Sequence, residues 1–173
     1  EEAQRFAAAE LKKYLHQMTG ATLEETPAPF ASADANSAPV LSIGLRRDLG
    51  GLVLLVSVQG FDGYCIVVAH DRIVLAGDNP RGTLYAVYDF LERAGCRWWH
   101  PTLDPNDPEV VPATTDLAFH PGQSTHASPI ELRVYNGSAF FFWIHPHQVL
   151  PQIDWAAKNR YNVVSWQPGH EPG

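Results

Sequence analysis

The sequence predicts an α+β protein, in which an antiparallel sheet with two helices packed on one face is followed by a strand–helix–strand unit. Three observations lead to this prediction. Residues 2–18 and 80–94 repeat apolar side chains at helical spacing, residues 52–77 hold adjacent strand-like runs, and strand and helix patterns return after Pro129. Helices and strands do not alternate regularly before that proline, which favours an α+β sandwich.

The helix expected at 80–94 has clear signals at both ends. Asp78 or Asn79 supplies an N-cap oxygen, and Pro80 takes the first helical position, where no amide donor is needed. Gly95 ends the helix, because glycine adopts the left-handed conformation at little cost. The stripe that we expect to lie on a sheet consists of Leu84, Val87, Tyr88 and Leu91.

The other helix is expected at 2–18, and Gly20 ends it. Its apolar face is expected to hold Phe6, Ala7, Leu11, Tyr14, Leu15 and Met18. The stretch 24–39, which is rich in Ala, Pro and Ser, then predicts a surface loop between this helix and the first strand.

Strands are expected in four runs of mainly apolar residues: Val40–Leu45, Leu52–Val58, Tyr64–Ala69 and Arg72–Gly77. His70 and Asp71 separate the last two runs and predict a two-residue hairpin connection. Residues 60–63 predict a loop. The run at 64–69 is apolar on both faces, so we expect it in the middle of the sheet.

Residues 101–129 form an irregular stretch with six prolines, such as commonly joins domains. It has room for two short strands, at Glu109–Val111 and Asp116–Phe119. The predicted domains are therefore 1–125, an accessory α+β domain, and 126–173, a linker with the start of a second domain.

That second domain is expected to open with a βαβ unit. Ile130–Asn136 and Tyr161–Trp166 are strand-like, and a helix at Pro151–Lys158, or starting from His147, connects them. A unit of this kind cannot bury its own sheet. We therefore interpret it as the opening of a larger α/β domain that the chain does not complete.

Composition excludes several function classes. The 173 residues carry a formal charge of −7, with no basic stretch of the kind that binds phosphates, so nucleic acid is not an expected partner. No apolar stretch is long enough to span a membrane.

Cys65 and Cys96 are either a disulfide or two buried thiols, and the thiols are favoured. His145 and His147 lack a third ligand nearby in the sequence, so neither a metal nor a cofactor is predicted.

The run RGTLYAVYDFLERAGCRWWHP (81–101), preceded by GYCIVVAHDRIVLAG (63–77), resembles a known family. It is similar to the non-catalytic, hexosaminidase-like domain that precedes the barrel in several glycoside hydrolases. The similarity is greatest to the N-terminal domain of family 67 α-glucuronidases and related proteins. The resemblance implies a (β/α)8 barrel whose first strand is 130–136 and whose second is 161–166. It also slightly favours a secreted or periplasmic location.

The resemblance further implies that this chain is the accessory domain and barrel entrance of a carbohydrate-active glycoside hydrolase. The expected partners are an oligosaccharide or polysaccharide and the protein's own barrel domain. In the resembled families the catalytic acids lie on later barrel strands, so no catalytic residue is predicted here and the fragment is expected to be inactive alone. The alternative is a free-standing glycan-binding or interaction module without enzymatic activity.

Two residues are candidates for contact with sugar. Arg133 lies on the first implied barrel strand, where family 20 β-N-acetylhexosaminidases use an arginine to hold sugar hydroxyls, although Val134 follows it here instead of glycine. Trp166 ends the second implied strand and is suited to stacking on a pyranose ring. A salt bridge is the alternative role for Arg133, and core packing is the alternative for Trp166. The residues Ser165–Gln167 replace the histidine-rich sequence of family 20, which argues against a true hexosaminidase.

Overall fold

The computed structural model describes most of the chain. The described residues are 2–25, 40–49, 59–101, 109–136 and 146–165. The predicted strand 52–58, most of the predicted loop 24–39, and His145 lie outside them.

The chain divides into two compact units. The first unit contains Glu1–Cys96 and Val111–Pro129, and the second contains Arg97–Val110 and Ile130–Gly173. Residues 97–110 thus belong with the C-terminal part of the chain, although they follow directly on the helix of the first unit.

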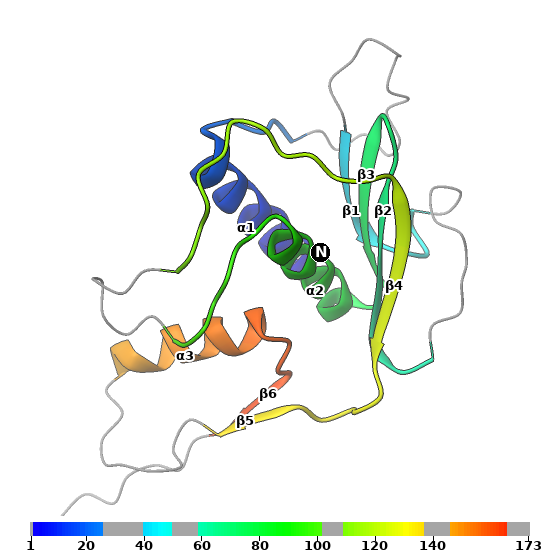
Figure 1. Ribbon diagram of the computed structural model, residues 1–173. Helices are drawn as coiled ribbons and strands as arrows, with labels where there is room; N and C mark the ends of the chain where they lie inside the picture. Colours follow the sequence, from blue (N-terminus) through cyan, green and yellow to red (C-terminus); the bar gives the residue numbers. More distant parts are fainter. Residues whose placement is uncertain (1, 26–39, 50–58, 102–108, 137–145, 166–173) are drawn as a thin grey trace, which may run out of the picture. The chain divides into compact units, whose positions relative to one another are not determined.

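The first unit contains a four-stranded sheet of order β1-β3-β2-β4 (Figure 1). Its strands are β1 (Val40–Leu45), β2 (Phe61–Val68), β3 (Arg72–Gly77) and β4 (Gly122–Ser128). β2 runs antiparallel to both β3 and β4, whereas β1 runs parallel to β3. The predicted purely antiparallel sheet is therefore wrong, and the sheet is mixed. The hairpin makes β3 reverse the direction of β2, and β3 then lies beside β1 with the same direction.

The β2–β3 hairpin confirms the predicted turn. The Ala69 amide donates to the Arg72 carbonyl at 2.8 Å across His70 and Asp71. β2 has a neighbour on each side, as its apolar pattern predicted. It begins at Phe61, however, inside the predicted loop, because a register shift between Phe61 and Tyr64 keeps this segment paired with β4.

Helix α2 (Pro80–Arg93) has the predicted ends. The Asn79 side chain accepts a hydrogen bond from the Gly82 amide at 2.8 Å, so Asn79 is the N-cap. At the other end Gly95 has φ +104°. The amides of Gly95 and Cys96 donate to the carbonyls of Glu92 and Leu91, which is the Schellman arrangement.

The buried surface of α2 is broader than the predicted stripe. Val87, Tyr88 and Leu91 are fully buried, as expected, but Leu84 is only half-buried. The further buried side chains are Thr83, Tyr85, Ala86 and Phe90. Periodicity alone identifies one contact face, whereas α2 lies between the sheet and helix α1 and is covered on both sides (Figure 1).

Helix α1 (Glu2–Thr19) lies with α2 on the same side of the sheet, which confirms the predicted placement of two helices on one face (Figure 1). Its buried apolar residues are Ala7, Leu11, Tyr14, Leu15 and Met18. Phe6, which was expected among them, is 47% exposed. The Tyr88 hydroxyl donates to the Glu10 carboxylate at 3.2 Å and connects the two helices in their buried interface.

Two predictions for the proline-rich stretch do not hold. Residues 116–119 form no strand, and at 109–111 only Val110 pairs, in a single bridge with Arg97. The fourth strand of the sheet is instead β4, whose sequence GQSTHAS has no apolar periodicity. An edge strand needs little apolar surface, so it gives no hydrophobic signal.

Both cysteines are free and buried, which decides between the two alternatives in favour of thiols. Cys65 points to the sheet face that also carries Val74 and Ala76, where Leu49 packs. Burial is the main cause that raises the pKa of the Cys65 thiol, so the thiolate is disfavoured. Cys96 contacts the Met18 sulfur at 3.7 Å and serves packing.

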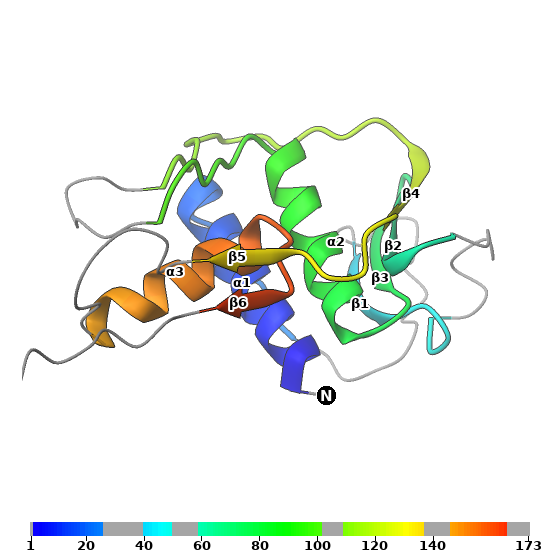
Figure 2. The same ribbon diagram turned by 90° about the horizontal axis from the view of Figure 1, so that it is seen from below.

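The second unit contains β5 (Val134–Asn136), α3 (Pro146–Lys158) and β6 (Val163–Ser165). The two strands are parallel and run side by side with α3 as their connection (Figure 2). This confirms the predicted strand–helix–strand order, with strands shorter than expected and a helix that begins before Pro151. In the described segments, no helix combines the length and apolarity that crossing a bilayer requires.

Candidate functional site

The carboxyl ends of β5 and β6 lie next to each other. Val134 pairs with Val163, Tyr135 with Val164, and Asn136 with Ser165. Parallel strands joined by a helical crossover bring their carboxyl ends to one edge, and α/β folds bind ligands at that edge. Asn136 and Ser165 are therefore the last paired residues before this edge, and both are exposed.

One face of the strand pair packs on α3 through aromatic side chains. The Tyr135 hydroxyl donates to the Gln152 side chain at 3.2 Å, and its ring meets Trp155 edge-on at 5.2 Å. Trp155 in turn stacks on Tyr161 at 5.8 Å. These contacts fix Tyr135 toward α3, so Val134 and Asn136 point to the opposite face.

That opposite face is uncovered in the described structure. Leu132 is 65% exposed and Val134 is 49% exposed. On α3, Leu150 is 70% exposed and Ile153 is 40% exposed. Parallel strands are normally covered on both faces, whereas this face of the β5–β6 pair is open in the described residues.

Trp98 connects the chain after the first unit to α3. The Trp98 carbonyl accepts hydrogen bonds from the Trp155 indole at 2.9 Å and from the Asn159 side chain at 3.2 Å. Trp98 is buried, whereas the adjacent Trp99 is 72% exposed. Trp98 therefore packs within the second unit, and Trp99 faces outward.

An ion cluster centres on the buried Lys158, which is 1% exposed. Its ammonium group bonds the carboxylates of both Asp154 and Glu109. Burial acts to lower the pKa of Lys158, but the hydrogen bonds that its ammonium group donates to Asp154 and Glu109 outweigh this effect, and the pKa lies above its ordinary value.

This cluster does not have the properties of a glycosidase acid pair. Such a pair needs one protonated and one ionised carboxyl group facing a substrate. Here one ammonium group binds both carboxylates of the cluster. We therefore assign Lys158, Asp154 and Glu109 to the stability of the second unit.

Arg133 lies at the amino end of β5, directly before its first residue. Its guanidinium group donates to the carbonyls of Arg160 and Ile130, each at 2.7 Å. These bonds connect the strand to the loop that leads into β6. They favour a structural role for this arginine, and its sugar-binding role stays a prediction. Trp166 lies outside the described residues.

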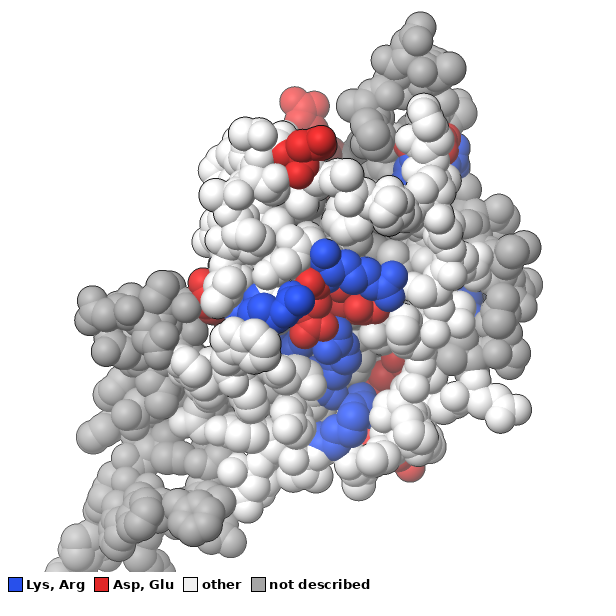
Figure 3. Space-filling model, viewed as in Figure 1, with Lys and Arg blue, Asp and Glu red and all other residues white. Residues whose placement is uncertain are grey.

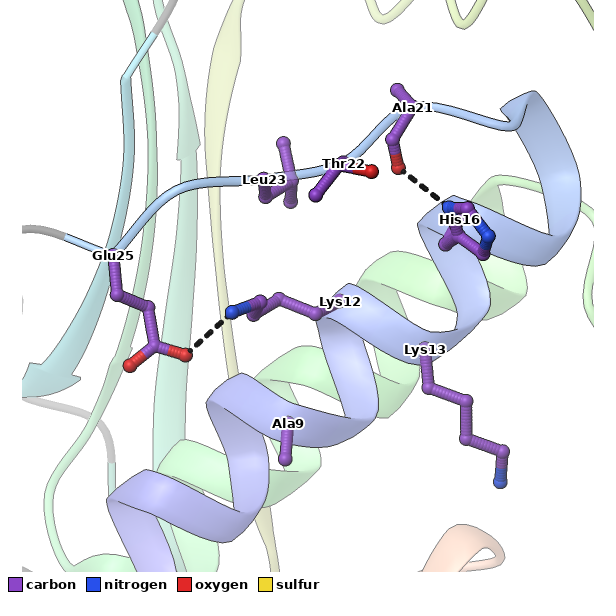
Figure 4. Close-up of a pocket in the computed structure, with 8 residues that line it drawn as sticks. All are labelled: Ala9, Lys12, Lys13, His16, Ala21, Thr22, Leu23 and Glu25. Atoms are coloured by element: carbon purple, nitrogen blue, oxygen red, sulfur yellow. Dashed lines mark hydrogen bonds and ion pairs between the residues drawn. The ribbon is translucent and has the colours of Figure 1, made fainter.

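A shallow groove of about 500 Å³ runs along the outer side of α1 in the first unit (Figure 4). Its polar groups are already engaged. The Lys12 ammonium pairs with Glu25 at 3.0 Å, and the His16 ring contacts the Ala21 carbonyl at 3.1 Å. The Lys13 ammonium pairs with Glu10 at 3.5 Å. The rest of the lining is Ala9, Thr22 and Leu23, and we assign no ligand to the groove.

Charged side chains of opposite sign lie close together on the face shown in Figure 3. Ion pairs in the first unit join Arg46 to Asp78 at 2.7 Å and Arg93 to Asp89 at 2.9 Å. Across the described segments, no group of three His, Cys, Asp or Glu side chains is arranged to hold a metal ion.

Comparison with known proteins adds no assignment. The chain matches no protein-family model, and no curated protein matches it either.

Proposed function

We propose that this chain is the accessory α+β domain and the barrel entrance of a carbohydrate-active glycoside hydrolase. The proposed substrates are oligosaccharides or polysaccharides with α-glucuronosyl or amino-sugar linkages. The proposal rests on the resemblance of residues 63–101 to the domain that precedes the barrel in such enzymes, and on the architecture that follows it.

The observation that carries the proposal is the uncovered parallel pair β5–β6. An α+β sandwich is followed by a βαβ unit whose second sheet face and helix stripe are apolar and exposed, as Leu132, Val134 and Leu150 show. In a (β/α)8 barrel, further βα units cover these surfaces, because the inner face of each strand packs in the barrel core. A self-sufficient binding module has no need of such an open layer.

The proposal assigns the catalytic acids to strands other than β5 and β6. The two carboxylates that gather in the second unit, Asp154 and Glu109, are bound to Lys158. Neither is placed to protonate a leaving group or to attack a sugar carbon. We therefore expect no turnover from this chain alone.

The test uses the complete product of the reading frame that encodes this chain. It is assayed for release of sugar from α-glucuronosyl-substituted xylo-oligosaccharides and from nitrophenyl N-acetyl-β-glucosaminide. Hydrolysis by the complete product, with none by residues 1–173, supports the proposal. A complete product that hydrolyses neither substrate class contradicts it. Heat of binding between residues 1–173 and a glycan panel would favour the alternative, a non-enzymatic glycan-binding module.

A further inference from the structure

The face of β5–β6 turned away from α3 changes from apolar to polar along the strands. Its first paired position holds Val134 and Val163, and the position two residues later holds Asn136 and Ser165. Apolar side chains thus give way to polar ones in the direction of the carboxyl edge. Both strands change at the same level, because the pairing is in register.

The interior of a (β/α)8 barrel also changes from apolar to polar side chains toward the carboxyl ends of its strands. Its layers are filled by branched apolar side chains, and the polar groups that meet a substrate lie at the carboxyl ends of the strands. Val134 and Val163 match an interior layer, whereas Asn136 and Ser165 match the mouth above it. Both polar residues are exposed in the described structure.

We propose that Asn136 and Ser165 together form a substrate-binding pair for adjacent hydroxyl groups of a saccharide, an inference that rests on the proposed function. The asparagine amide and the serine hydroxyl each offer a donor and an acceptor, as a sugar hydroxyl does. Neither side chain ionises near neutral pH, so the pair orients the sugar and transfers no proton. The ligand class is a polyhydroxylated sugar ring that is held through its hydroxyl groups.

Arg133, the arginine expected to contact sugar, occupies the other end of the same strand. Its side chain bonds backbone carbonyls before β5 begins. In a barrel the amino ends of the strands serve stability. The substrate-facing role on this strand therefore belongs to Asn136, three residues further on.

The test measures steady-state kinetics of the complete gene product carrying Asn136→Ala or Ser165→Ala, on the substrate that the wild type hydrolyses. Loss of one neutral hydrogen bond to the sugar is expected to raise KM by roughly 3- to 10-fold in each variant. The inhibition constant of the released sugar should rise by a similar factor. Glu131→Ala is the matched control, because Glu131 is exposed near the amino end of β5.

The outcomes separate the two proposals. If the wild type is active and both variants keep its KM and its inhibition constant, the pair is not a sugar site, although the glycosidase proposal stands. If the wild type hydrolyses no glycoside, both proposals fail. If Asn136→Ala lowers the melting temperature, Ser165→Ala alone decides, because a serine at the end of a strand is replaced by alanine without loss of packing. An equal rise in KM for Glu131→Ala would also overturn the inference.

Discussion

At Gly82, helix propensity and packing make opposite predictions. The residue lies in the first turn of α2, where alanine favours a helix by about 1 kcal/mol over glycine. A Cβ atom there would lie 2.4 Å from the Gly63 carbonyl oxygen, a backbone atom. The clash is expected to dominate, so Gly82→Ala should lower the free energy of unfolding by about 1–3 kcal/mol. Urea denaturation measures this loss. Gly122→Ala, where a Cβ meets nothing within 4 Å, should be neutral, and an equal loss there would remove the steric explanation.

Lys158 is the residue whose removal should cost the second unit most. Lys158→Met leaves the Asp154 and Glu109 carboxylates close together without their cation. The Asp154 side chain is 42% exposed and that of Glu109 is 21% exposed, so water screens the uncompensated charge and the expected loss is about 1–3 kcal/mol. The triple variant with Asp154→Asn and Glu109→Gln should recover most of that loss. If the triple variant is as unstable as Lys158→Met, lost packing and not uncompensated charge explains the effect.

The same lysine predicts a dependence of stability on alkaline pH. Its pKa in the folded protein lies above the ordinary value of 10.5. The contribution of Lys158 to the free energy of unfolding is therefore complete below pH 10.5. It is lost as the pH rises through the higher pKa of the folded protein. The difference in unfolding free energy between the wild type and Lys158→Met should stay constant up to about pH 10 and shrink above about pH 11. A difference that stays constant throughout would contradict the assignment.

At the scale of elements, α2 was predictable because its signals are local. Asn79, Pro80 and Gly95 act on the residues next to them, and the structure has each in its expected role. β4 was not predictable, since GQSTHAS owes its strand conformation to pairing with β2 and not to its own composition. Pairing with β6 also decides where β5 begins. Strand pattern extends back to Ile130, but pairing starts at Val134, and this places Arg133 at the amino end.

The N-cap of α2 gives a prediction for the whole helix. Asn79 accepts from the Gly82 amide and donates to the Asp62 carboxylate at 2.9 Å. Asn79→Ala removes both bonds and should lower the free energy of unfolding by about 1–2 kcal/mol. Asn79→Ser keeps a side-chain oxygen for capping but not the bond to Asp62. It should therefore lower the free energy of unfolding by less than Asn79→Ala does. Thermal unfolding followed by circular dichroism measures both variants, and equal losses would show that the Asp62 contact dominates.

At the scale of the whole molecule, the two units differ in how completely they are covered. The first unit buries its helices and central strands in one core, from Tyr14 on α1 to Leu75 on β3. The second unit leaves large apolar side chains exposed on both its sheet and its helix. The sequence predicts a βαβ unit with too few strands to bury its own sheet, and the completion of this unit by further βα units stays a prediction.

The open apolar face of β5–β6 has a measurable consequence for this chain alone. The open face with Leu132 and Val134 should bind the dye anilinonaphthalene sulfonate in the folded protein, since exposed apolar patches of this kind bind apolar ligands. Leu132→Ser with Val134→Ser should lower the dye fluorescence while the first unit stays folded. Phe6→Ser is the matched control, because Phe6 is 47% exposed on α1 and far from this face in sequence. Equal loss of fluorescence in the control would place the dye on α1. No dye binding by the wild type would mean that the face of β5–β6 is covered in solution, and the case for missing βα units would lose its main support.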